Sequence, residues 1–65
     1  MDKAIEVLER KRGEWLERGE WHRREAMRHH VKGDYSKRDE EQQLTKLAID
    51  NIHGLEYAIA LLKNN

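Results

Sequence analysis

A single strong break, at Gly33-Asp34, interrupts the helical patterning of this 65-residue chain. Glycine readily adopts the left-handed backbone conformation that ends a helix, and the aspartate that follows can cap the next helix. Lys32 places a positive charge in the last turn before the break, where the helix dipole favours it. We therefore expect one all-α domain with two long helices, over residues 2–32 and 35–63, joined by a tight turn.

The turn sequence Gly33-Asp34-Tyr35 resembles the tight inter-helix turn of tetratricopeptide repeats, in which GDY joins the first helix to the second. The likeness covers only the residues around the turn, and the small-residue signature of these repeats is missing from the chain. The resemblance implies that the two helices run antiparallel, as a helical hairpin. It implies no function.

The first helical segment has one apolar side and one charged side, and Asp2 is a good N-cap residue for it. The apolar side chains that recur at about 100° per residue are Ile5, Leu8, Trp15, Leu16, Ala26 and Met27. Charges at the favourable i, i+4 spacing form the pairs Glu6–Arg10, Glu14–Arg18 and Glu20–Arg24. Gly19 falls at the centre of the apolar side, where another backbone can approach closely. Gly13 or Gly19 could each break the helix, but we prefer one continuous helix, with a bend as a further possibility.

The second segment becomes apolar almost all round towards its end. Residues 44–65 carry 12 apolar side chains and 4 charges, whereas residues 1–43 carry 22 of the 26 charges. One wide stripe contains Leu44, Leu47, Ala48, Ile52, Leu55, Ala58, Ile59 and Leu62, while Ile49, Tyr57, Ala60 and Leu61 lie off it. A helix that is apolar on every side must be buried on every side, and one partner helix cannot cover it. We expect the hairpin to self-associate, most simply as a two-fold dimer that forms a four-helix bundle, or as a higher oligomer.

Polar residues interrupt both apolar faces, at Arg12 in the first segment and at Asn51 in the second. Folding the chain at the turn should place Asn51 beside Trp15. A buried Asn commonly fixes register and oligomeric state, and a buried Arg can extend to solvent or pair with an acid across a subunit boundary. The alternative is a pocket between subunits, in which a guanidinium, an aromatic ring and an amide bind a ring-containing anion. The candidate ligand-binding residues are Arg12, Trp15, His22, Arg23 and Asn51.

Residues 21–30, WHRREAMRHH, carry three Arg and three His against one Glu. His22, Glu25 and His29 share a helix face at the spacing i, i+3, i+7, which could hold a divalent metal, but this spacing is not a diagnostic ligand signature. The commoner explanation is a solvated basic face, neutralised by the acidic run 39–41 that the hairpin places beside it. We expect no metal site.

Trp21 faces away from the apolar side of its segment by helical phase, in the neighbourhood of Arg24 and Arg28. An exposed Trp beside Arg is typical of contact hot spots. These three residues form a candidate interaction surface, and a second interface between subunits is the competing interpretation.

The composition argues against several classes of protein. The absence of Cys excludes disulfides and thiolate metal sites, and the balance of 13 acidic against 13 basic residues argues against nucleic-acid binding. No apolar run reaches the length of a membrane span, and the start MDKAIEVLER does not have the features of a signal peptide. No nucleophile motif, paired-acid signature or phosphate loop occurs. We expect a cytoplasmic, non-enzymatic protein without a cofactor.

The size, the hairpin plan and the available Arg, Trp and Asn side chains resemble small phage proteins that sequester signalling nucleotides to blunt bacterial immune signalling. The resemblance implies nucleotide-like anions held in pockets between subunits. The same plan resembles plasmid copy-control RNA binders. Three functions follow as hypotheses: a nucleotide sponge, an interaction protein that blocks a host protein through the surface around Trp21, and a structural or RNA-binding accessory. The first is slightly preferred.

Overall fold

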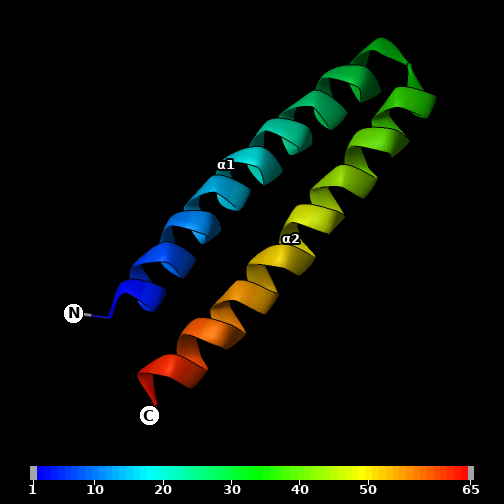
Figure 1. The fold of residues 1–65 in the computed structure, drawn as a ribbon. Coiled ribbons are helices and arrows are strands. Elements are labelled where there is room, and N and C mark those ends of the chain that lie inside the picture. The colour runs from blue at the N-terminus through cyan, green and yellow to red at the C-terminus, as the bar shows by residue number, and fades with distance from the viewer. Residues whose placement is uncertain (1, 65) are drawn as a thin grey trace.

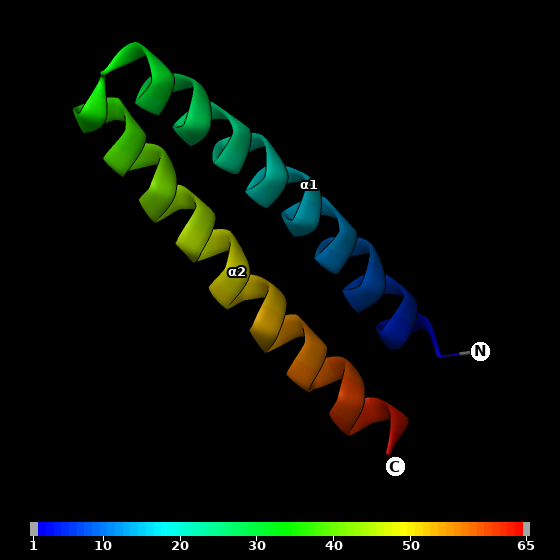
Figure 2. The same ribbon diagram turned by 180° about the vertical axis from the view of Figure 1, so that it is seen from behind.

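Two antiparallel helices make up the structure, a computed structural model that describes residues 2–64. Helix α1 spans Lys3–Lys32 and helix α2 spans Tyr35–Lys63. Figure 1 shows the two helices side by side, with the two chain ends together at the end opposite the turn, and Figure 2 shows the same hairpin from behind. The molecule measures 49 × 14 × 11 Å, which is one helix thick in its thinnest dimension. The predicted all-helical hairpin is confirmed.

Local hydrogen bonds fix both ends of the turn. Gly33 has φ 79°, in the left-handed region, and its N–H donates to the carbonyl of His30 at 3.1 Å. The N–H of Asp34 donates to the carbonyl of His29 at 2.9 Å, which completes a Schellman motif. The Asp34 carboxylate then accepts from the backbone N–H of Lys37 at 3.3 Å. The sequence-based roles of Gly33 and Asp34 are therefore confirmed.

The start of α1 is capped in the same way. The carboxylate of Asp2 accepts a hydrogen bond of 2.9 Å from the backbone N–H of Ala4. The helix then continues without interruption through Gly13 and Gly19, as the sequence predicts. The hairpin thus consists of two continuous helices, each of which is capped at its N-terminus by an aspartate side chain.

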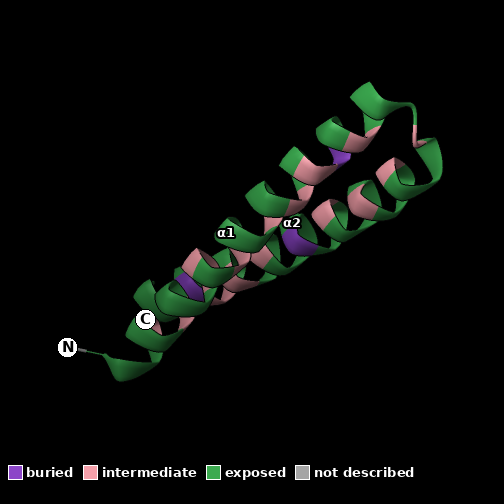
Figure 3. Cartoon of the chain, turned by 90° about the horizontal axis from the view of Figure 1, so that it is seen from above, coloured by how far each residue is buried: buried purple, intermediate pink, exposed green. Residues whose placement is uncertain are grey.

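The least exposed residues of each helix recur at alternating intervals of three and four positions, the spacing of a coiled-coil face. On α1 they are Ile5, Leu8, Arg12, Trp15, Gly19, His22, Ala26 and His29. On α2 they are Arg38, Glu41, Thr45, Ala48, Ile52, Leu55 and Ile59. We call these two rows the seam. Figure 3 colours each residue by burial, and within residues 2–64 only Ala26, Ala48 and Ile59 are buried, so the core is narrow.

The two helices approach each other closely at Gly19. A Cβ atom placed on Gly19 would lie 3.3 Å from the Cβ of Ala48, which is tighter than an ordinary van der Waals contact. The prediction that Gly19 permits a close approach is confirmed. The residue opposite Gly19 is Ala48 rather than the adjacent Leu47, because the small alanine side chain allows the two backbones to come together.

Five apolar residues predicted for the packed faces are exposed, and those predictions are wrong for the single hairpin: Leu16, Met27, Leu44, Leu47 and Leu62. Each helix has only one neighbour, so a strip of about two positions in seven is covered. The register set by the turn places Glu41 and Thr45 in that strip rather than Leu44 and Leu47.

Asn51 is also exposed, so the prediction that it interrupts the packed face is wrong within one hairpin. Its side-chain amide donates to the carbonyl of Leu47 at 2.8 Å, one turn earlier in α2. The three i, i+4 ion pairs predicted for α1 are absent from the described part of the chain. The guanidinium of Arg18 instead lies 5.0 Å from the centroid of the Trp15 ring, within the range of a cation–π contact.

Candidate functional site

The five candidate ligand-binding residues do not converge on one cavity within the hairpin. Arg12, Trp15 and His22 are half-buried in the seam, whereas Arg23 and Asn51 are exposed. By helical phase Arg23 lies on one flank of the seam and Asn51 on the other. The proposed combination of a guanidinium, an aromatic ring and an amide therefore does not form in a single copy.

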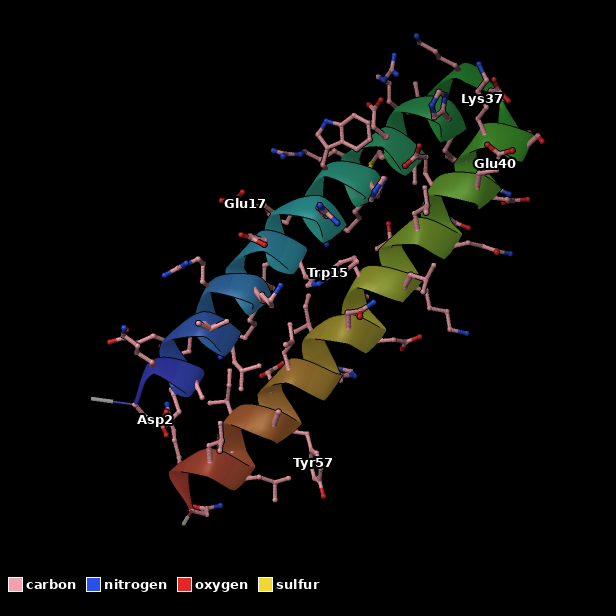
Figure 4. All side chains as sticks on the ribbon, viewed as in Figure 1. Asp2, Trp15, Glu17, Lys37, Glu40 and Tyr57 are labelled. Carbon is pink, nitrogen blue, oxygen red and sulfur yellow. The ribbon has the colours of Figure 1, made fainter. Side chains whose placement is uncertain are left out.

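Two seam residues of that set have clear local surroundings. Trp15 lies on the side of α1 that faces α2, as Figure 4 shows, and it is covered by Arg18. Arg12 forms no ion pair with any described residue, and Glu9, one of its predicted partners, pairs instead with Lys63 at 3.3 Å. Both side chains therefore contribute to the seam of the hairpin.

Within the described chain, His22 and Glu41 make the only hydrogen bond between two seam side chains that joins α1 to α2. The Nδ1 atom of His22 contacts the carboxylate of Glu41, and the His22 ring lies edge-on to Trp21 with 5.1 Å between centroids. The contact with Glu41 joins residues 21–30 of α1 to the acidic run at the start of α2. His22 is a structural pairing residue in this geometry.

The second residue of the possible metal set, Glu25, is bound by Arg28. The guanidinium donates to both carboxylate oxygens, at 2.9 and 2.8 Å. This hydrogen bonding lowers the pKa of Glu25 below its ordinary value of 4.5 and raises the pKa of Arg28. Among residues 2–64, no group of three His, Asp or Glu side chains is arranged to hold a metal ion.

One flank of the seam carries a shallow groove, which we call the Arg23 groove. It consists of two cavities, of about 260 and 200 Å³, that share Arg23 and Thr45. Their other lining residues are Ala26, Met27, His30, Arg38 and Gln42 in the first, and Leu16, Gly19, Glu20, Ile49 and Ile52 in the second. The floor is largely apolar, and cationic side chains lie at its turn end.

The charge at the turn end of the Arg23 groove is already engaged. Arg38 donates to His30 at 3.0 Å and to the carboxylate of Asp39 at 3.0 and 2.9 Å. Its guanidinium also lies 4.7 Å from the centroid of the Tyr35 ring. Arg23 is therefore the cation of this groove that has no ion-pair partner within the described chain.

The opposite flank carries a row of uncharged residues on α2, which we call the leucine row: Leu44, Leu47, Asn51, Gly54, Ala58 and Leu61. Their spacing of three and four positions puts the row about 100° around the helix from the seam. Leu47 is 56% exposed and lines two open hollows of about 460 and 360 Å³ together with Gln43. Every residue of the leucine row except the half-buried Ala58 is exposed in one hairpin.

The candidate interaction surface is exposed as predicted. Trp21 is 52% exposed, and Arg24 and Arg28 are also exposed. Arg28 is held by Glu25, whereas Arg24 makes no ion pair in the region that the structure covers. A tryptophan of this exposure next to a free arginine retains the character of a contact surface.

Comparison with known proteins gives no assignment: no family model, curated protein or solved structure matches this chain. Over the described residues, neither helix contains an apolar stretch long enough to span a bilayer.

Two features of the site escaped the sequence-based interpretation. The first is the polar pair of His22 and Glu41 within the seam, and the second is the cluster of Arg38 with His30 and Tyr35. Strict alternation of three and four positions from Ile5 onwards would have placed His22 in the seam. Hydrophobicity alone favours Leu16 and Met27, each of which lies one position after a seam residue.

Proposed function

We propose that this protein is a non-enzymatic binding protein that acts as a homo-oligomer, with a dimer of hairpins in a four-helix bundle as its simplest form. The observation that carries the proposal is that twelve large apolar side chains are exposed within residues 2–64, whereas only Ile59 and the small residues Ala26 and Ala48 are buried. Chains of this kind rarely leave so much apolar surface in water unless another surface covers it. Association supplies the cover that the second helix does not.

The surface area supports association. The hairpin exposes 5282 Å², about 900 Å² more than the roughly 4,400 Å² typical of a folded monomer of its mass. A standard protein interface covers about 800 Å² on each partner. A dimer of hairpins would therefore bring the exposed area per chain back to the ordinary range.

Sedimentation velocity at micromolar concentration tests this proposal. We expect a dimer or a larger assembly, whose dissociation on dilution is accompanied by loss of helical circular dichroism. A stable, fully helical monomer at 1–10 micromolar would overturn it. Native mass spectrometry of protein purified without denaturation gives the subunit number and any retained small molecule in the same measurement.

The binding activity that fits this geometry best is contact with another protein through the surface of Trp21, Arg24 and Arg28. This surface lies on α1, outside the leucine row of α2. Trp21→Ala should reduce partner binding while the sedimentation coefficient stays unchanged. A parallel loss of assembly would instead identify Trp21 as a subunit contact.

A second candidate function is sequestration of a nucleotide-like anion, and the Arg23 groove favours it. Arg23 lies over an apolar floor, with the guanidinium of Arg38 and the Tyr35 ring near its turn end. A ligand at a hundredfold excess over its dissociation constant should stabilise the fold by about 2.7 kcal/mol. A panel of linear and cyclic nucleotides tests this by thermal shift, with Arg23→Ala as the variant that abolishes the effect. No shift with any of them would reject the nucleotide sponge.

A further inference from the structure

We propose that a second copy of this chain docks on the leucine row of α2, with the two α2 helices antiparallel about a two-fold axis between Asn51 and Gly54. This inference rests on the proposed self-association and assigns the surface, the direction and the register of the contact. The surface was defined above by Leu44, Leu47, Asn51, Gly54, Ala58 and Leu61.

The position of the leucine row around α2 fits a second helix neighbour. In a four-helix bundle each helix contacts two others, about a quarter of a turn apart around its axis. The seam already provides the contact with α1, and the leucine row lies about 100° from it. From Leu44 to Leu61 the row is about 26 Å long, and it contains no charged residue.

The other flank of α2 does not offer an equivalent surface. Ile49 is 44% exposed there, but apart from Ala60 its neighbours at helical spacing are polar or charged: Gln42, Lys46, His53, Glu56 and Lys63. A helix packed on that flank would bury several charges without partners, at a cost of several kcal/mol for each isolated ion. The leucine row is the flank that a second apolar helix can cover.

The order of residues in the row suits an antiparallel copy. With the axis between Asn51 and Gly54, Leu44 meets the partner's Leu61 and Leu47 meets the partner's Ala58. The polar side chain of Asn51 then lies against the partner's Gly54, where no side chain stands in its way. Each contact occurs twice, because a two-fold interface repeats every pair.

A lone hairpin leaves Gly54, like Gly13, in open space, without a contact that requires a glycine. A Cβ atom placed there would have no atom within 4 Å, although glycine in a helix interior costs about 1 kcal/mol relative to alanine. Gly19, by contrast, has Ala48 against it. In the proposed dimer, Gly54 allows the two copies of α2 to approach closely, as Gly19 allows α1 to approach α2.

A matched pair of charge substitutions tests the surface. Leu47→Glu and Ile49→Glu both replace an exposed apolar residue of α2, on opposite flanks. We expect Leu47→Glu to raise the dimer dissociation constant at least about 100-fold, because the charge enters the interface twice. Ile49→Glu should change it by less than about threefold. Equal effects, or a larger effect of Ile49→Glu, would overturn the proposal.

A matched pair of glycine substitutions tests the close approach. Gly13 and Gly54 both lie inside helices with open space at the Cβ position. In a lone hairpin Gly13→Leu and Gly54→Leu should both stabilise, because leucine is the better helix former. In the proposed dimer only Gly54→Leu weakens association, by more than about tenfold, since its side chain fills the place of Asn51 of the partner subunit. Unimpaired association of Gly54→Leu would contradict the proposed centre.

Cross-linking tests the direction, since the chain has no Cys of its own. Chains with Asn51→Cys and chains with Gly54→Cys are mixed and oxidised. An antiparallel pair predicts mostly mixed disulfide dimers, whereas a parallel pair predicts dimers of like chains and would overturn the register. If the wild-type protein sediments as a monomer, both this inference and the proposed self-association are wrong. If the wild type is a dimer and Leu47→Glu leaves its dissociation constant unchanged, only this inference is wrong.

Discussion

The half of the seam next to the turn is polar except for the small residues Gly19, Ala26 and Ala48, whereas the half farther from the turn consists mainly of large apolar side chains. Near the turn, His22 pairs with Glu41, and Arg38, Thr45 and His29 occupy the neighbouring seam positions. In the far half the seam consists of Ile5, Leu8, Trp15, Ile52, Leu55 and Ile59, with Arg12 as the polar exception. The two halves of the helix pair are thus stabilised by different interactions, with polar contacts near the turn and mainly apolar packing far from it.

The covalent turn explains why the two halves can differ. Close to Gly33 the two helices are tethered, so bringing them together costs little loop-closure entropy and weak polar contacts suffice. Far from the turn the chain ends can separate, and burial of apolar area is needed to hold them. The comparison implies that apolar seam residues should matter more than polar ones, and that the turn itself should matter for the polar half.

The largest effect is expected for Ile59→Ala in the far half. Ile59 is only 5% exposed, and truncation of a buried isoleucine to alanine typically costs about 2–4 kcal/mol. Ile49→Ala, on the exposed flank of the same helix, should cost less than about 1 kcal/mol. Urea unfolding followed by circular dichroism measures both, and similar losses would contradict the contrast between the seam and the flank.

The next effect concerns the turn. Gly33 has φ 79°, a conformation in which an L side chain costs about 1–2 kcal/mol, so Gly33→Ala should lower the free energy of unfolding by that amount. Gly13→Ala is the matched control, because it lies in a regular helix with open space and should gain up to about 1 kcal/mol. If Gly33→Ala were as stable as the wild type, the turn would not be the element that holds the polar half.

A smaller effect is expected for the polar pair across the seam. A double-mutant cycle of His22→Ala and Glu41→Ala should give a coupling energy of about 0.5–1 kcal/mol, because both side chains are half-buried and in contact. The pair of His53→Ala with Glu41→Ala, which share no contact, should be additive within about 0.3–0.5 kcal/mol. Absence of coupling between His22 and Glu41 would mean that the polar half relies on the turn alone.

The turn and the caps could be predicted from the sequence because their causes are local. Asp2, Gly33 and Asp34 act on backbone groups within a few residues, and their chemistry is the same in any surroundings. Continuity through Gly19 was predictable for a related reason, since its place on the apolar side pointed to a close helix contact.

The choice of packing face could not be predicted, because it depends on how the turn orients the two helices. Two adjacent rows of α2 are apolar, and the one that contains Leu44 and Leu47 is apolar closer to the turn. The structure turns the row of Ala48 and Ile59 towards α1 instead, since only a small residue fits against Gly19. The candidate ligand residues Arg12 and Asn51 were grouped on the assumption of the other row, which is why they separate in the hairpin.

The smallest effect comes from an ion pair outside the seam and depends on pH. Arg28 lowers the pKa of Glu25 in the folded state below its ordinary value of 4.5, so the pair stabilises the fold above that value. This contribution is lost as the pH falls through the folded-state pKa. Glu25→Gln should therefore be slightly less stable than the wild type at pH 7 and equal to it near pH 3, by urea unfolding.

Salt distinguishes this ion pair from the polar seam. Glu25 and Arg28 lie on the surface of α1, so the deficit of Glu25→Gln at pH 7 should shrink at an ionic strength near 1 M, where the screening length falls to about 3 Å. The coupling between His22 and Glu41 is shielded by the helices on both sides and should persist in the same salt. If both effects vanished together, the seam near the turn would be as open to water as the outer face of α1, and the contrast between the two halves would rest on the apolar residues alone.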